Sequence, residues 1–167
     1  MNSGTEAVMT ALRIAKASSK KESVVKFKQC YHGHADSMLV SASSALQGSS
    51  AGVRNVGTII LDNYDLHLIE ETFKTHLPGA LIIEPLPANN GLTILSNDFL
   101  ENLLKLCQKY KVISIFDEVI SGFRCSFGGI SSQLSIQPDL ITYGKILGGG
   151  FPIGALAGKK SLLDLLA

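Results

Sequence analysis

Short, unbroken apolar stretches alternate with amphipathic helical patterns along most of this sequence. The apolar stretches are four or five residues long and rich in Ile, Leu and Val. Strands of this kind are buried on both faces, which is typical of a parallel sheet covered by helices on each side. They are predicted at residues 24–28, 58–61, 80–84, 112–116, 139–143 and 154–158. The pattern therefore predicts an α/β protein with a mostly parallel central sheet.

Amphipathic helices are predicted between these strands, at residues 3–16, 65–74 and 97–110. Ser3 and Glu6 have the Ser-x-x-Glu spacing of a capping box at the start of the first helix. The third helix has one apolar face, formed by Phe99, Leu100, Leu103, Leu104 and Cys107. The alternation of strands and helices places helices on both faces of the sheet.

The length of 167 residues suits one domain with a buried core and is short for two. We therefore expect residues 1–167 to form a single domain. Charged residues make up 17% of the chain, against about 25% in typical soluble domains. Together with a mean hydropathy of +0.25, this favours strands buried on both faces, or a surface that a partner covers.

Charge and targeting signals argue against several classes of protein. With 15 basic and 14 acidic residues, the chain is not expected to bind nucleic acid or a membrane surface. Its apolar runs are shorter than the roughly 18 residues of a membrane helix, and its first residues do not form a secretory signal. Cys30, Cys107 and Cys125 are odd in number and widely spaced, as expected for reduced thiols in a cytoplasmic protein.

Four chemically useful side chains follow predicted strands: Tyr31, Glu84, Asp117 and Lys145. In open parallel sheets, ligands bind beyond the carboxyl ends of the strands. One such placement would mean little, but four together predict a single site at that edge.

Lys145 lies among glycines, between Gly144 and the run at 148–150. A desolvated lysine on such a turn can act as a nucleophile toward carbonyl groups, although a surface lysine in a flexible loop fits the same pattern. The glycines do not form a phosphate-binding loop of the Gly-x-x-x-x-Gly-Lys type, because Lys145 precedes them.

Two further features have both a structural and a functional interpretation. The carboxylate of Asp117 needs a donor or cation, which could be Arg124, Arg13 or a protonated ring nitrogen of a ligand. Ser3, Gly4 and Thr5 open a helix, so they either cap it or bind a phosphate there.

The segment His32-Gly33-His34-Ala35-Asp36 has the His-x-His-x-Asp spacing of some zinc hydrolases. Those enzymes have a further histidine after the aspartate, where this chain has Ser37. We therefore expect no metal site here and expect the histidines to shape a pocket beside Tyr31, which stacks on a planar ring or packs in the core.

Taken together, four segments resemble the class III pyridoxal-phosphate aminotransferases. They are residues 2–9, 31–36, 117–124 and 144–150, and the resemblance extends over essentially the whole chain. Within this family the segments are most similar to the glutamate-1-semialdehyde 2,1-aminomutases. The resemblance implies the large, cofactor-binding domain of fold-type I enzymes, with pyridoxal 5'-phosphate as the cofactor.

The resemblance also implies a role for each site residue. Lys145 would bind the cofactor covalently and move protons, Asp117 would hold the protonated ring nitrogen, and Tyr31 would stack on the ring. The phosphate would be held by Ser3, Gly4 and Thr5. Asn89 would lie near the ring, and Glu84 and His32 would support the site.

The aminomutase assignment depends on few residues, namely Thr5, His34, Asp36 and Asn89. It implies an amino-aldehyde substrate, glutamate-1-semialdehyde, converted into 5-aminolevulinate for tetrapyrrole synthesis by moving an amino group within one molecule. The alternatives are a class III transaminase that needs an external amino donor, or a product without activity of its own.

Family members are much longer than this chain. Compared with them, residues 1–167 lack an N-terminal segment and a C-terminal small domain, and residues 41–53 form a shorter loop. The family is homodimeric, which implies a second subunit. A plastid location stays open if a transit peptide precedes Met1.

Overall fold

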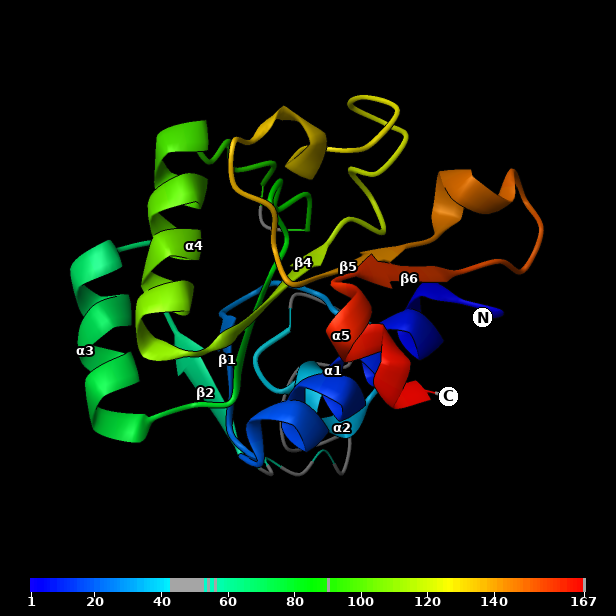
Figure 1. The fold of residues 1–167 in the computed structure, drawn as a ribbon. Helices are drawn as coiled ribbons and strands as arrows, with labels where there is room; N and C mark the ends of the chain where they lie inside the picture. The colour runs from blue at the N-terminus through cyan, green and yellow to red at the C-terminus, as the bar shows by residue number, and fades with distance from the viewer. Residues whose placement is uncertain (43–52, 54, 56, 90, 167) are drawn as a thin grey trace.

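Six strands form one sheet in the computed structural model, which describes residues 1–42, 53, 55, 57–89 and 91–166 (Figure 1). The strands are β1 (Val24–Phe27), β2 (Thr58–Leu61), β3 (Ala80–Ile83), β4 (Ile113–Asp117), β5 (Leu140–Tyr143) and β6 (Ala155–Gly158). Their order across the sheet is β2-β1-β3-β4-β5-β6. The first five are parallel and β6 runs antiparallel to β5, which confirms the predicted, mostly parallel sheet.

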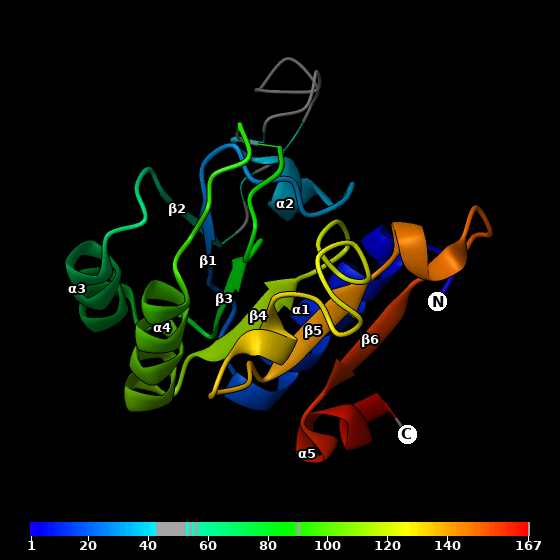
Figure 2. The same ribbon diagram turned by 90° about the horizontal axis from the view of Figure 1, so that it is seen from above.

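Helices cover both faces of the sheet, as predicted. The longer helices are α1 (Gly4–Ser19), α3 (Leu66–His76) and α4 (Asn97–Tyr110), and the shorter ones are α2 (Asp36–Leu39) and α5 (Lys160–Leu163). Figures 1 and 2 show α3 and α4 side by side on one face, with α1 and α5 on the other. None of the helices in the described ranges has the length and apolar character needed to cross a bilayer.

The strands supply side chains to two separate cores. In β3, Leu81 and Ile83 pack in the cluster under α3 and α4, whereas Ala80 and Ile82 pack in the cluster under α1. In β4, Phe116 and Ile115 divide in the same way. This alternation explains why each strand is an unbroken apolar run: both of its faces are buried.

The ends of the helices follow from local chemistry. The Ser3 side chain accepts a hydrogen bond from the Glu6 amide at 3.1 Å, while the Glu6 carboxylate accepts from the Asn2 amide at 2.6 Å. The carboxylate thus reaches the residue before the cap rather than the cap itself. The predicted end at residue 16 was nearly one turn short, because the helix continues until Lys20 adopts a left-handed conformation, with φ 57°.

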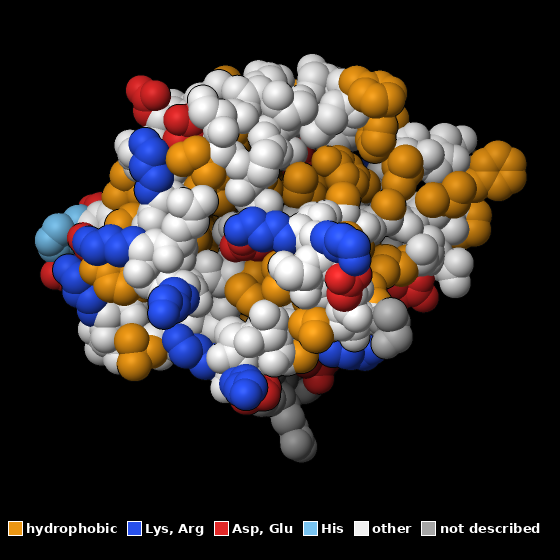
Figure 3. All heavy atoms as spheres, viewed as in Figure 1, with side chains coloured by type: hydrophobic (Ala, Val, Ile, Leu, Met, Phe, Trp, Pro, Cys, Tyr) orange, Lys and Arg blue, Asp and Glu red, His pale blue; other side chains and the backbone are white. Residues whose placement is uncertain are grey.

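Several large apolar side chains stay exposed on one side of the molecule. Phe127 and Phe151 are 90% and 74% exposed, and Ile146 and Ile153 are also exposed. Figure 3 shows hydrophobic side chains gathered at the upper right, over the segments that join β4 to β5 and β5 to β6. Apolar patches of this kind are typical of surfaces that contact another protein segment. The predicted shorter loop at residues 41–53 lies almost wholly outside the described residues.

Candidate functional site

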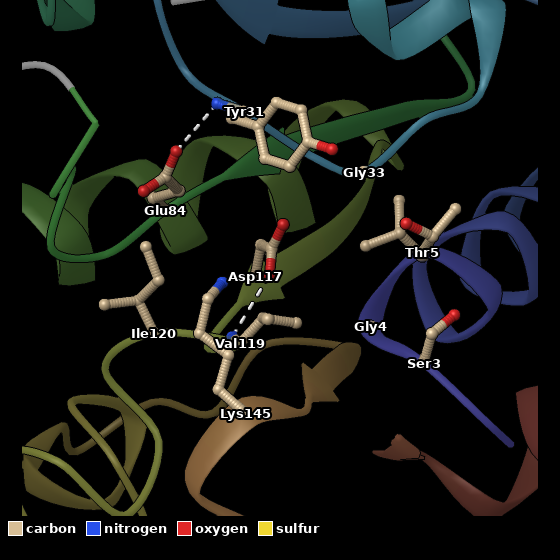
Figure 4. Close-up of a pocket in the computed structure, with 11 residues that line it drawn as sticks. Ser3, Gly4, Thr5, Tyr31, Gly33, Glu84, Asp117, Val119, Ile120 and Lys145 are labelled. Atoms are coloured by element: carbon tan, nitrogen blue, oxygen red, sulfur yellow. Dashed lines mark hydrogen bonds between the residues drawn. The ribbon is translucent and has the colours of Figure 1, made fainter. Parts of the chain in front are cut away.

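A pocket of about 160 Å³ opens at the carboxyl edge of the sheet (Figure 4). Tyr31 comes from the segment after β1, Glu84 follows β3, Asp117 ends β4, and Lys145 follows β5. The N-terminus of α1 completes the wall with Ser3, Gly4 and Thr5. The structure therefore brings together the four strand-end residues and the helix start that the sequence singled out.

Asp117 is 5% exposed and makes three hydrogen bonds. Its Oδ2 lies 2.8 Å from Nδ1 of His32, and its Oδ1 accepts from the Thr142 hydroxyl and the Val119 amide. The suggested ion pairs with Arg124 or Arg13 are wrong: the cationic partner of Asp117 in the described chain is His32. A carboxylate held from behind by three donors keeps a fixed orientation.

His32 does not line the pocket but lies buried behind Asp117, at 1% exposure. Burial by itself lowers the pKa of His32, but its hydrogen bond to Asp117 and the charge of that carboxylate outweigh burial and raise the pKa to about 9, with nearby Cys30 acting in the same direction. At neutral pH the imidazolium therefore donates from Nδ1 to the carboxylate. The second ring nitrogen, Nε2, has no hydrogen-bond partner among the described residues.

The stability of the protein is expected to fall between pH 6.5 and 9 through this pair. The folded-state pKa of His32 is raised, so its contribution is complete below the unfolded value of about 6.5 and is lost as the pH rises through about 9. The shift corresponds to about 3 kcal/mol of unfolding free energy. Urea unfolding of the wild type and of His32→Gln, compared at pH 6, 7.5 and 9, measures it.

Groups other than His32 titrate in both proteins, so the difference between the two pH profiles isolates this residue. His67→Gln is the matched control, because the His67 side chain is 79% exposed. Parallel profiles for the wild type and His32→Gln would contradict the prediction.

The start of α1 carries free hydrogen-bond donors that face the pocket. Within the part of the chain that the structure describes, the Gly4 and Thr5 amides donate to no protein acceptor, whereas the Glu6 amide is capped by Ser3. Gly33 leaves room beside the Thr5 hydroxyl, because a Cβ at this position would lie only 2.8 Å from the hydroxyl oxygen. Two free amides, a hydroxyl and the positive end of a helix dipole fit a phosphate group.

Glu84 holds Tyr31 in place through the backbone. Its Oε1 accepts from the Tyr31 amide at 2.8 Å, and its carboxylate also accepts from the Ala88 amide and from the Asn89 side chain at 3.3 and 3.4 Å. Asn89 is exposed and does not line the pocket; among the described residues, Glu84 is its hydrogen-bonded link to the site.

Lys145 points from its loop toward Asp117 (Figure 4). Its backbone is left-handed, with φ 44°, which costs a non-glycine residue about 1–2 kcal/mol. Strain of this kind often occurs at functional sites. The side chain is exposed, so the described chain does not by itself desolvate the amine.

Four further residues line the pocket that the sequence had not predicted there: Val8, Gly33, Val119 and Ile120. Val119 and Ile120 follow Asp117 and Glu118 directly, so their place just beyond the end of a strand was the available signal. By contrast, the His-x-His-x-Asp residues separate, because His32 is buried while His34 and Asp36 are exposed. No group of three potential metal ligands occurs within the described ranges.

Glu118 is a further buried carboxylate, in addition to Glu84 and Asp117, that the sequence did not single out. It is fully buried, and it accepts from the Ser121 hydroxyl at 2.6 Å and from the amides of Ile130 and Ser131 at 2.9 and 2.7 Å. These bonds tie the long segment between β4 and β5 back to the end of β4. Glu118 thereby supports the stretch that carries Val119 and Ile120.

Known proteins resemble this chain in both sequence and fold. A glutamate-1-semialdehyde 2,1-aminomutase from Leptospira interrogans serogroup Icterohaemorrhagiae serovar Lai (strain 56601) is 52% identical over 100% of this chain and 40% of its own length. An omega-transaminase from Sphaerobacter thermophilus superposes with a TM-score of 0.86 at 34% identity, over 98% of this chain and 40% of that one. A glutamate-1-semialdehyde-aminomutase variant from Pseudomonas aeruginosa PAO1, in complex with PMP, gives 0.85 at 25% identity, over 98% and 38%.

The chain thus spans about 40% of the length of the aminomutase that it matches. The family model described as Aminotransferase class-III matches residues 1–167, the whole of the chain. This protein therefore belongs to the class-III aminotransferases.

Proposed function

We propose that this chain is the cofactor-binding portion of a pyridoxal-phosphate enzyme that acts as a glutamate-1-semialdehyde 2,1-aminomutase. The observation that carries the proposal is the convergence of Lys145, Asp117, Tyr31 and the start of α1 on one pocket (Figure 4). Relatives that bear the aminomutase name are 42–52% identical over the whole of this chain, which supports this choice within the family.

The pocket residues fit pyridoxal phosphate group by group. The free amides of Gly4 and Thr5, with the hydroxyls of Ser3 and Thr5, would bind the phosphate. Tyr31 lines the same pocket and would cover one face of the ring. Asp117, oriented by its hydrogen bond with His32, would hold the proton on the ring nitrogen.

When bound, the cofactor withdraws electrons from the substrate carbon that loses a proton and carries the amino group. The Lys145 amine would hold the cofactor covalently, and when free it would take and return the substrate proton. Glu84 keeps the Tyr31 backbone in place during these steps. In the aminomutase reaction the amino and oxo groups of one amino-aldehyde exchange places, so no external amino donor is consumed.

A transaminase that uses an external amino donor is the second candidate. It is supported by the superposition on an omega-transaminase, which at 34% identity matches better in sequence than the superposed aminomutase at 25%. The two functions differ in one measurable way: a transaminase turns over only when an amino donor is supplied, whereas an aminomutase converts its substrate alone.

The active form is proposed to be a homodimer in the cytoplasm. The exposed apolar side chains at Phe127, Ile146, Phe151 and Ile153 support a surface that another subunit or segment covers. Sedimentation of the isolated chain tests the assembly.

Borohydride reduction of the chain mixed with pyridoxal phosphate tests the proposal, with peptide mass mapping as the readout. The expected result is a label on Lys145 alone, because Lys145 is the lysine that lines the pocket. Lys145→Ala should abolish the label, while Lys160→Ala should keep it, since the Lys160 side chain is 87% exposed and away from the pocket. Labels scattered over several lysines, or none, would reject the cofactor site in this chain.

A further inference from the structure

Lys26 on β1 lies outside the pocket and, unlike the exposed Lys145, is fully buried. Its Nζ donates to the backbone carbonyls of Cys30, Met38 and Val40, at 3.0, 2.9 and 2.9 Å. An ammonium group has three N–H donors, so all three are used. Lysine is almost never fully buried unless its charge is satisfied in this way.

The three carbonyls bracket the segment that carries Tyr31 and His32. Cys30 lies immediately before Tyr31, whereas Met38 and Val40 lie at the end of α2. Helix α2 is a single turn without a side-chain cap, so it contributes little rigidity of its own. One backbone hydrogen bond, from the Gln29 amide to the Ser41 carbonyl, also joins the two ends of the segment.

The peptide bond between Cys30 and Tyr31 is held from both sides. Its carbonyl accepts from Lys26, and its N–H donates to the Glu84 carboxylate at 2.8 Å. Two groups of opposite charge thus fix the plane of the peptide unit from which the Tyr31 side chain projects. Hydrogen bonds to charged groups are the stronger ones, so this plane is held more firmly than neutral contacts would hold it.

Lys26 is protonated under ordinary conditions. Burial lowers its pKa to about 8, while the charges of Cys30 and Glu84 act in the opposite direction. Near pH 7 the group therefore keeps its charge and its three donors.

We propose that Lys26 is a positioning residue that, together with Glu84, orients the peptide unit before Tyr31 and thereby sets the Tyr31 ring against the bound cofactor ring. The inference rests on the proposed function for its cofactor part. Lys26 itself makes no contact with the cofactor. Borohydride reduction should therefore attach no pyridoxyl label to Lys26.

Lys26→Met tests the proposal, because it keeps an unbranched apolar chain and removes all three donors. Two measurements are made near pH 7: hydrogen exchange of the Tyr31 amide in the cofactor-free chain, and spectral titration with pyridoxal phosphate. Inorganic phosphate is added as a competitor to probe the α1 site separately. Lys28→Met is the matched control, since the Lys28 side chain is 53% exposed and pairs with Asp62.

The expected result is at least about tenfold faster exchange at Tyr31 and at least about tenfold weaker binding of pyridoxal phosphate. The inhibition constant of phosphate should stay within about twofold of the wild type, because the Lys26 contacts lie in the 30–40 segment and not in α1. Lys28→Met should behave as the wild type. Lys26→Gln, which keeps two donors, should lie between, and it replaces Lys26→Met if that variant does not fold.

Unchanged exchange and unchanged cofactor affinity would overturn the proposal. Equal weakening of cofactor and phosphate binding would also overturn it, because it indicates a general loss of structure. If the wild type itself retains no pyridoxal phosphate, the proposed function and the cofactor part of the inference fail together. The exchange measurement still decides whether Lys26 holds Tyr31.

Discussion

Asp117→Asn is expected to slow proton removal from an amine substrate by at least about 100-fold while leaving pyridoxal phosphate attached to Lys145. The neutral amide cannot keep the ring nitrogen protonated, and its N–H₂ group would face the Nδ1 donor of His32. Loss of the buried charge pair should also lower the unfolding free energy by about 3 kcal/mol. Stopped-flow absorbance of the cofactor band measures the rate, and borohydride mapping confirms that the cofactor remains bound.

The matched control is Asp139→Asn. Asp139 is a carboxylate beside the same sheet that accepts from the Ser114 amide and hydroxyl, both at 2.8 Å, and pairs with Lys159. It lies outside the pocket, so its substitution should reduce stability without changing the rate. A rate for Asp117→Asn within a fewfold of the control would contradict the role proposed for Asp117.

Gly129→Ala is expected to destabilise the fold by about 4 kcal/mol or more, a drop in Tm on the order of 10 °C. A Cβ at this position would overlap the Glu118 carboxylate, which is fully buried and accepts three hydrogen bonds. Relieving the overlap requires the network around Glu118 to break, in addition to the cost of φ +75° for a residue with a side chain. Thermal and urea unfolding measure the change.

Gly91→Ala is the control that separates the steric cost of Gly129→Ala from its backbone cost. Gly91 also has a positive φ, +68°, but a Cβ there would meet nothing within 4 Å. Its substitution should therefore cost only the backbone component, about 1 kcal/mol. Equal destabilisation by the two alanines would show that the Glu118 network contributes nothing.

The strand and helix pattern could be predicted because it depends on local periodicity. The helix at residues 97–110 agrees with α4 at both ends, and the six strands agree to within two residues at each end. Tyr31, Glu84, Asp117 and Lys145 could be placed at one edge because parallel strands end on the same side. The antiparallel direction of β6 was not predicted, since a four-residue strand carries no local mark of its direction.

The partners of the charged groups were decided only by the tertiary structure. His32 and Asp117 are 85 residues apart, and Tyr31 and Glu84 are 53 apart, so no local pattern connects them. The sequence suggested Arg13 or Arg124 as the ionic partner of Asp117. In the folded protein the partner is His32, which is buried beside Asp117. Lysine is usually exposed, so the residue type alone predicted a surface position for Lys26. Its burial is possible because three backbone carbonyls of the folded segment accept hydrogen bonds from its Nζ.

The sequence by itself determined the class of sheet, the faces of the helices and the edge at which the site lies. These features follow from the spacing of apolar residues, which acts over a few positions of the chain. The tertiary structure alone decided which buried charge meets which donor, because such contacts form only when strands distant in sequence pack side by side and water is excluded between them.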